Sequence, residues 1–99
     1  MKPFKDLNYE KYAKIEEFGS ELKEIKLFIL QDKVIENKNI IYNIIDSFLF
    51  YIGTYCHSFE NTPGYKKLIK LYRDENIRGN AGKIVLICEG LLNNIKISL

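Results

Sequence analysis

The fold of this chain is decided by one stretch, residues 40–56, which reads IIYNIIDSFLFYIGTYC. Twelve of its seventeen residues are apolar or aromatic, and Asp46 is its only charge. The polar residues Asn43, Ser47, Thr54 and His57 fall close to one line on a helix, with Phe50 filling the gap in that line. A thin polar stripe on an apolar cylinder predicts a central helix over about 40–57 that partners surround on most sides.

A strand is the alternative for this stretch, because β-branched and aromatic residues are abundant in it. The run is long for a strand, however, and its apolar and polar residues do not alternate. A membrane-spanning helix would need about 20 apolar residues. Here Asn39 and His57 bound the run, and Asp46 near its middle costs about 2.5–3.5 kcal/mol on insertion scales. We therefore expect a buried helix and no membrane span.

Working back from this stretch, apolar residues at Tyr12, Ile15 and Phe18 predict a first helix after a short lead of residues 1–7. Gly19 is expected to end that helix in the left-handed conformation, and the serine after it to cap the next helix. One continuous helix through Gly19 is the alternative, at a cost of about 1 kcal/mol. A second helix is then expected over about 21–36.

The polar turn 37–39 ends in Asn39, which suits the N-cap of the central helix. After the central helix, residues 59–62 are expected to form a loop. Thr62-Pro63 then places a capping residue directly before proline, which is typical of a helix start.

Two helices are expected in the C-terminal third, over 63–76 and 81–96. The glycines and asparagines of residues 76–82 predict a turn between them. A short strand over 83–88 is the alternative for the start of the last helix. Together the segments predict a single all-α domain, residues 1–99, folded as a compact antiparallel bundle of four to five helices around the central helix.

Composition narrows the class of protein only a little. The hydrophobic content of 46% is ordinary for a globular domain, and the net charge of +2 is too small to dictate a partner. Charge is unevenly distributed, since residues 1–60 carry eight lysines and ten acids and residues 61–99 carry seven cations and three acids. Isoleucine, lysine and asparagine, whose codons are A/T-rich, dominate the chain and suggest a bacterial, phage or mobile-element source. No apolar segment follows the charged N-terminus, so a cytoplasmic protein is expected.

The sequence offers no convincing catalytic or metal site. Cys56 and His57 are neighbours, but adjacent helical side chains point about 100° apart, so one cannot readily activate the other. Cys56 and Cys88 are expected to be buried free thiols, with a disulfide as the alternative. Residues 78–83 resemble a phosphate loop only in composition, because its glycine spacing is too short and Ile84 replaces the required hydroxyl. We therefore expect no enzyme, no metal and no cofactor, although an anion could bind at the N-terminus of the last helix.

A basic cluster is the best surface signal in the chain. Its cations have the spacing of an exposed helix face followed by a turn, and an ordinary solvated face is the plain alternative. Comparison with a helix-turn-helix motif is unfavourable, because the second helix has few polar side chains with which to read bases. The candidate binding residues are Tyr65, Lys66, Lys67, Lys70, Arg73, Arg78 and Lys83.

Two further expectations concern single residues. Asp46 is expected to be exposed or paired along the polar stripe of the central helix. The chain contains thirteen tyrosines and phenylalanines in total, which is more than one small hydrophobic core can bury. The tyrosines expected near the surface or at an interface are Tyr9, Tyr51, Tyr55 and Tyr65.

These features predict a small cytoplasmic protein that binds another protein, such as an inhibitor, an immunity-type partner of a toxin or a phage accessory factor. Nucleic-acid binding through the basic cluster of residues 66–83 is the alternative. A homo-oligomer is compatible with both functions.

Overall fold

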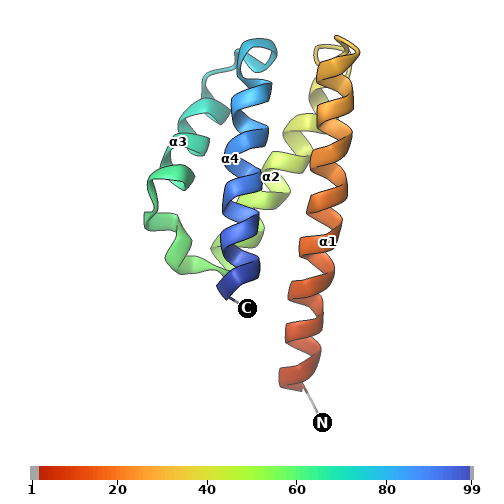
Figure 1. Ribbon diagram of the computed structural model, residues 1–99. Coiled ribbons are helices and arrows are strands. Elements are labelled where there is room, and N and C mark those ends of the chain that lie inside the picture. The colour runs from red at the N-terminus through yellow and green to blue at the C-terminus, as the bar shows by residue number, and fades with distance from the viewer. Residues whose placement is uncertain (1–2, 99) are drawn as a thin grey trace.

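The computed structural model describes residues 3–98, with side chains from residue 11 onward. Within this part of the chain there is no strand, and the helices are joined by short turns (Figure 1). This confirms the predicted all-α fold with four α-helices. The elements are α1 (Pro3–Leu30), α2 (Lys38–Tyr55), the short 3₁₀ helix η1 (His57–Asn61), α3 (Pro63–Arg73) and α4 (Ile77–Ser98).

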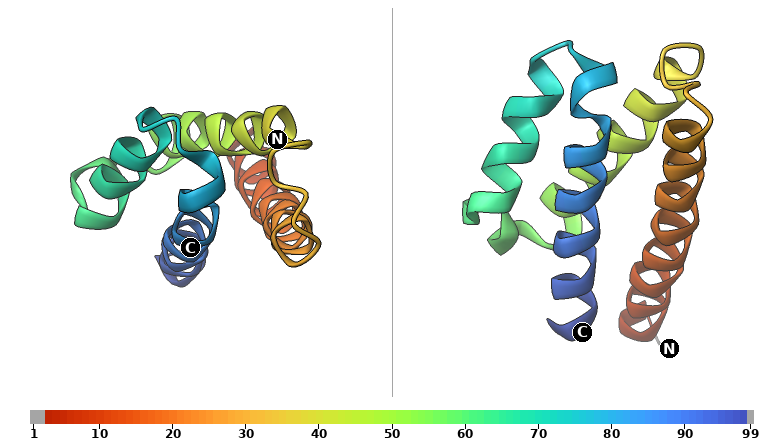
Figure 2. Two further views of the ribbon diagram at one scale, coloured as in Figure 1. Left: turned by 90° about the horizontal axis from the view of Figure 1, so that it is seen from above. Right: turned by 45° about the horizontal axis from the view of Figure 1, so that its top comes forward.

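Successive helices run in opposite directions, which confirms the antiparallel bundle. Helix α4 lies between α1 and α3, and α2 crosses obliquely behind it (Figures 1 and 2). Buried residues from all four helices meet in one core. The N-terminal ends of α2 and α4 and the C-terminal ends of α1 and α3 therefore lie at one end of the molecule. Within the described part of the chain, none of the helices combines the length and the hydrophobicity that crossing a membrane needs.

Helix α1 runs without a break from Pro3 to Leu30, so the predicted break at Gly19 was wrong and the alternative of a continuous helix is confirmed; the predicted lead is helical from residue 3 onward. The apolar register explains why. Ile15, Phe18, Leu22 and Ile25 follow one another at helical spacing across Gly19, and all four are buried. Keeping that stripe on the core outweighs the roughly 1 kcal/mol that a glycine costs inside a helix.

Because α1 is continuous, Gly19→Ala should stabilise the protein by about 0.5–1 kcal/mol. No atom lies within 4 Å of the position that a Cβ on Gly19 would occupy, and its φ is not positive. Alanine would therefore add helix propensity without a clash. Urea unfolding should show a higher midpoint with an unchanged slope. A lower midpoint would indicate the left-handed glycine that the sequence first suggested.

Helix α1 ends at Leu30, six residues before the predicted end at 36. Asp32 adopts a left-handed conformation, with φ of 55°. The Lys33 N–H donates to the Phe28 carbonyl at 2.8 Å and the Asp32 N–H to the Ile29 carbonyl at 3.2 Å. This pair of bonds is a Schellman motif, which closes a helix. Aspartate takes the place that glycine usually holds, so sequence alone gave little warning.

Helix α2 begins two residues before the predicted start, and Asn37 rather than Asn39 is its N-cap residue. The predicted stripe of Asn43, Ser47, Phe50 and Thr54 is exposed. Phe50 is 76% exposed, so the expectation that partners surround this helix on most sides was too strong. One face of α2 packs on the core while the other meets solvent. The buried residues are Ile41, Ile44, Ile45, Phe48, Tyr51 and Ile52.

Helix α3 starts where the sequence predicted. Pro63 occupies its first turn, and the Thr62 hydroxyl accepts a hydrogen bond from the Tyr65 N–H at 3.3 Å. Helix α4 begins at Ile77, so the turn predicted over 76–82 was too long and the strand alternative over 83–88 was wrong.

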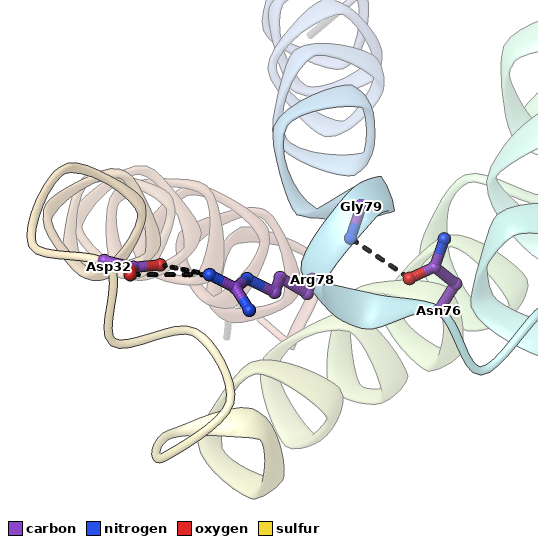
Figure 3. A network of polar contacts seen from close by, with 4 residues as sticks. All are labelled: Asp32, Asn76, Arg78 and Gly79. Atoms are coloured by element: carbon purple, nitrogen blue, oxygen red, sulfur yellow. Dashed lines mark hydrogen bonds and ion pairs between the residues drawn. The ribbon is translucent and has the colours of Figure 1, made fainter.

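The actual turn between α3 and α4 is short. Glu75 is left-handed, with φ of 58°, and the Asn76 side chain caps α4 by accepting from the Gly79 N–H at 3.2 Å (Figure 3). A buried side chain supports the same turn, because the Asn80 amide donates to the Asp74 carboxylate at 3.0 Å.

Candidate functional site

Four of the predicted binding residues form one exposed surface on α3, called here the basic face: Lys66, Lys67, Lys70 and Arg73. Lys66, Lys70 and Arg73 repeat at four and three residues and so lie on one side of the helix. Leu68, which is fully buried, anchors the opposite side of α3.

The cations of the basic face have no acidic partner within residues 11–98. The ion pairs of this region involve other side chains: Lys14–Glu17, Lys26–Glu89, His57–Glu60 and Arg78–Asp32. Asp74, the nearest acid in sequence, accepts the Asn80 amide. The face therefore presents four positive charges to solvent that form no ion pair, with the Asp74 carboxylate at its C-terminal edge beside Lys70 and Arg73.

The other predicted residues separate from this face. Arg78 points toward the end of α1, where its guanidinium lies 3.3 Å from the Asp32 carboxylate (Figure 3). Lys83 is exposed on the flank of α4 toward α3, one turn before Ile87, which lies beside Gly64 of α3. Tyr65 is half-buried. Burial raises the pKa of its hydroxyl, and the nearby negative charge of Glu60 raises it further.

A second feature lies at the end of the bundle where α2 and α4 begin, and it is called here the end hollow. Its volume is about 680 Å³. Lys38 and Tyr42 of α2, Tyr72 and Arg73 of α3, and Arg78 of α4 line it. Arg73 belongs to both the basic face and the end hollow, so the two surfaces are continuous.

A comparison of this chain with protein-family models, curated proteins and solved structures found no match.

Sequence reasoning missed the end hollow, because it joins residues that are distant in the chain. Lys38 and Arg73 are 35 positions apart, and only the alternating helix directions bring them to one end. One signal was available. Asn76 followed by a helix-compatible run could have been recognised as an N-cap, which would have placed Arg78 in the first turn of α4.

Asp46 lies where the polar stripe predicted. It is exposed, and its carboxylate accepts a hydrogen bond from the Tyr72 hydroxyl at 3.3 Å. Tyr51 contradicts its prediction, because it is only 3% exposed and its hydroxyl donates to the Lys11 carbonyl at 3.2 Å. Tyr55 is half-buried, and Tyr9 lies outside the described side chains.

The Cys56–His57 pair does not form a nucleophilic site. Cys56 is buried, whereas His57 is exposed and its Nδ1 lies 2.7 Å from the Glu60 carboxylate. Burial raises the pKa of the Cys56 thiol, although the charge of Lys11 acts in the other direction. Thiolate, the reactive form, is therefore disfavoured. Within residues 11–98 no group of acids, histidine and cysteines is placed to hold a metal ion.

Both cysteines are buried free thiols, which confirms that prediction. We expect both to react slowly with a disulfide reagent in the folded protein. Burial raises the pKa of Cys88 from 9.0 to about 12, which lowers its thiolate fraction about a thousandfold at neutral pH. Reaction should be fast for two thiols per chain in denaturant. A fast native thiol, or fewer than two thiols after unfolding without reductant, would contradict this arrangement.

The same shift predicts lower stability at alkaline pH. The folded state holds the Cys88 proton more tightly than the unfolded chain does. The resulting stabilisation is complete below pH 9 and is lost as the pH rises from 9 toward 12. Thermal unfolding of Cys88→Ala should therefore depend less steeply on pH in this range than that of the unmodified protein. Equal slopes would show that Cys88 does not contribute.

Proposed function

We propose that this chain is a non-enzymatic binding module whose basic face docks on an acidic surface of a partner protein. The observation that carries the proposal is that Lys66, Lys67, Lys70 and Arg73 are exposed on one helix and form no ion pair within residues 11–98. Such an arrangement leaves these cations available to an acidic partner. It would increase the association rate and disfavour basic partners.

A protein partner suits this face better than a nucleic acid does. The four cations lie within eight residues, or about 10 Å of helix, and can meet only a few phosphates. Helix α4, which would have to enter a groove in a helix-turn-helix arrangement, is buried along one whole side. Among the residues that it exposes in its first three turns, only Arg78 and Lys83 carry polar side chains, and Arg78 is paired with Asp32.

The length of the chain and its free thiols favour a particular class of binding protein. A small helical chain of 99 residues with exposed cations on one helix suits an inhibitor or an immunity-type protein of a bacterium, phage or mobile element. Two free thiols in the core favour a reducing compartment such as the cytoplasm.

The test is the affinity for a partner obtained by co-purification and then purified. Lys66, Lys67 and Lys70 are replaced together by glutamate, and titration calorimetry measures the dissociation constant. Because each reversal turns attraction into repulsion, we expect affinity to fall by about a hundredfold or more. The matched control reverses three exposed lysines away from α3 that form no ion pair: Lys23, Lys33 and Lys96.

The control has the same change in net charge, so it separates the basic face from long-range charge. Equal loss in both variants, or binding that is insensitive to both, would contradict the proposal. Salt-dependent binding of DNA or RNA that only the α3 variant loses would favour the nucleic-acid alternative.

A further inference from the structure

The end hollow is an open depression whose lining mixes charged, polar and aromatic side chains. Its volume of about 680 Å³ lies within the usual range for ligand pockets, about 300–1,000 Å³. It is formed by α2, α3 and α4 together. Nothing in the proposed docking of α3 on an acidic protein requires this hollow.

Positive charge converges on the hollow from three helices. Lys38 begins α2, Arg73 ends α3, and Arg78 lies in the first turn of α4. Lys38 and Arg73 form no ion pair within residues 11–98, whereas Arg78 is paired with Asp32. Glu75 is the one acid in the lining. Two unpaired cations thus remain against one carboxylate among the lining residues, while the carboxylates of Asp46 and Asp74 lie just outside the lining, next to Tyr72 and Arg73.

Two helix N-termini lie at the hollow, because Lys38 and Asn39 of α2 and Ile77 and Arg78 of α4 all line it. Unpaired N–H groups and the helix dipole favour anions at such ends. The first turn of α2 has no side-chain cap, since the Asn37 amide donates to the Lys33 carbonyl instead.

Aromatic rings supply the second recognition element. Tyr42 and Tyr72 line the hollow as an edge-to-face pair, with ring centroids 5.6 Å apart. The hydrogen bond from the Tyr72 hydroxyl to Asp46 on α2 restrains the Tyr72 ring. Half-buried tyrosine rings beside cations suit a ligand that carries both an aromatic group and a phosphate.

We propose that the end hollow binds a phosphorylated ligand of nucleotide size. Lys38 and Arg73 hold the phosphate, and the rings of Tyr42 and Tyr72 contact the aromatic base. The guanidinium of Arg73 provides bidentate donors, and the lysine provides a point charge.

Adenosine monophosphate serves as the probe, with inorganic phosphate and adenosine as the two partial ligands. Chemical-shift titrations at low salt follow binding to the intact protein. We expect the monophosphate to bind at least about tenfold more tightly than either part, because phosphate and ring contacts act together. The shifted resonances should be those of residues that line the hollow.

Two variants separate the contributions. Lys38→Gln should weaken binding of the monophosphate about tenfold, and Tyr42→Leu should do the same by removing a ring. Tyr42→Phe should bind normally because it keeps that ring. Lys66→Gln, which changes the basic face alone, should also bind normally. Arg73 is left unchanged because it belongs to both surfaces.

The proposal is overturned if the monophosphate does not bind at millimolar concentration, or if inorganic phosphate binds as tightly. It is also overturned if Lys66→Gln weakens binding as much as Lys38→Gln does. Circular dichroism of each variant shows whether the fold is retained, and Lys38→Gln, at an exposed position, keeps the test decisive if Tyr42→Leu is unfolded.

Discussion

Replacing Phe48 by alanine should destabilise the folded protein by about 3–5 kcal/mol. Phe48 is 2% exposed and is among the largest fully buried side chains in the core. Its ring meets the Phe18 ring of α1 edge-on, with centroids 5.1 Å apart and planes 72° apart. Alanine would remove this aromatic contact and leave a cavity between α1 and α2. Urea unfolding, followed by circular dichroism, measures the change.

Phe50 provides a control on the same helix. It is two residues further along and 76% exposed, so Phe50→Ala should change stability by less than about 0.5 kcal/mol. A domain of this length has a free energy of unfolding of about 5–15 kcal/mol. The Phe48 variant could therefore lose most of its stability, while the Phe50 variant keeps nearly all of it. Similar losses for both would mean that α2 does not face the core as described.

The contrast between these two residues shows how far sequence could predict α2. The polar stripe placed Phe50 on the line that proved to be exposed, and it left Phe48 on the buried side. The Thr62-Pro63 pair also predicted the start of α3. Where the apolar register is regular or a cap has its usual residue, local sequence is enough.

Helix ends were harder to predict, because the residues that form them were unusual. Asp32 and Glu75 adopt the left-handed conformation that glycine usually takes, whereas Gly19 and Gly79 lie inside helices. A rule that breaks helices at glycine therefore divided α1 and shortened α4. Tertiary packing outweighed the local preference in both cases.

The candidate sites divide in the same way. The basic face could be predicted because its four cations lie within eight residues of one helix. The end hollow could not, because its cations come from three helices and its tyrosines from two. Only the chain topology brings those residues together.

Leu68→Ala should be the second most damaging of these changes, with a loss of about 2–5 kcal/mol. Leu68 is the only buried residue of α3, and its side chain is fully buried. The helix is otherwise held by half-buried side chains, so truncating Leu68 should release α3 before the rest of the bundle unfolds. Hydrogen exchange should then be fastest in residues 63–73, while buried parts of α1 and α4 stay protected.

The consequence of that release distinguishes a structural role from a binding role. Lys67→Ala, at the adjacent exposed position, should leave stability within about 0.5 kcal/mol of the original and slow association with an acidic partner. Leu68→Ala keeps every charge of the basic face but removes the rigid helix that holds the charges at fixed spacing. Leu68→Ala should therefore weaken binding, because a partner would have to order α3 again on association and that ordering costs free energy. Uniform exchange across all four helices in Leu68→Ala would show instead that α3 unfolds only together with the whole bundle.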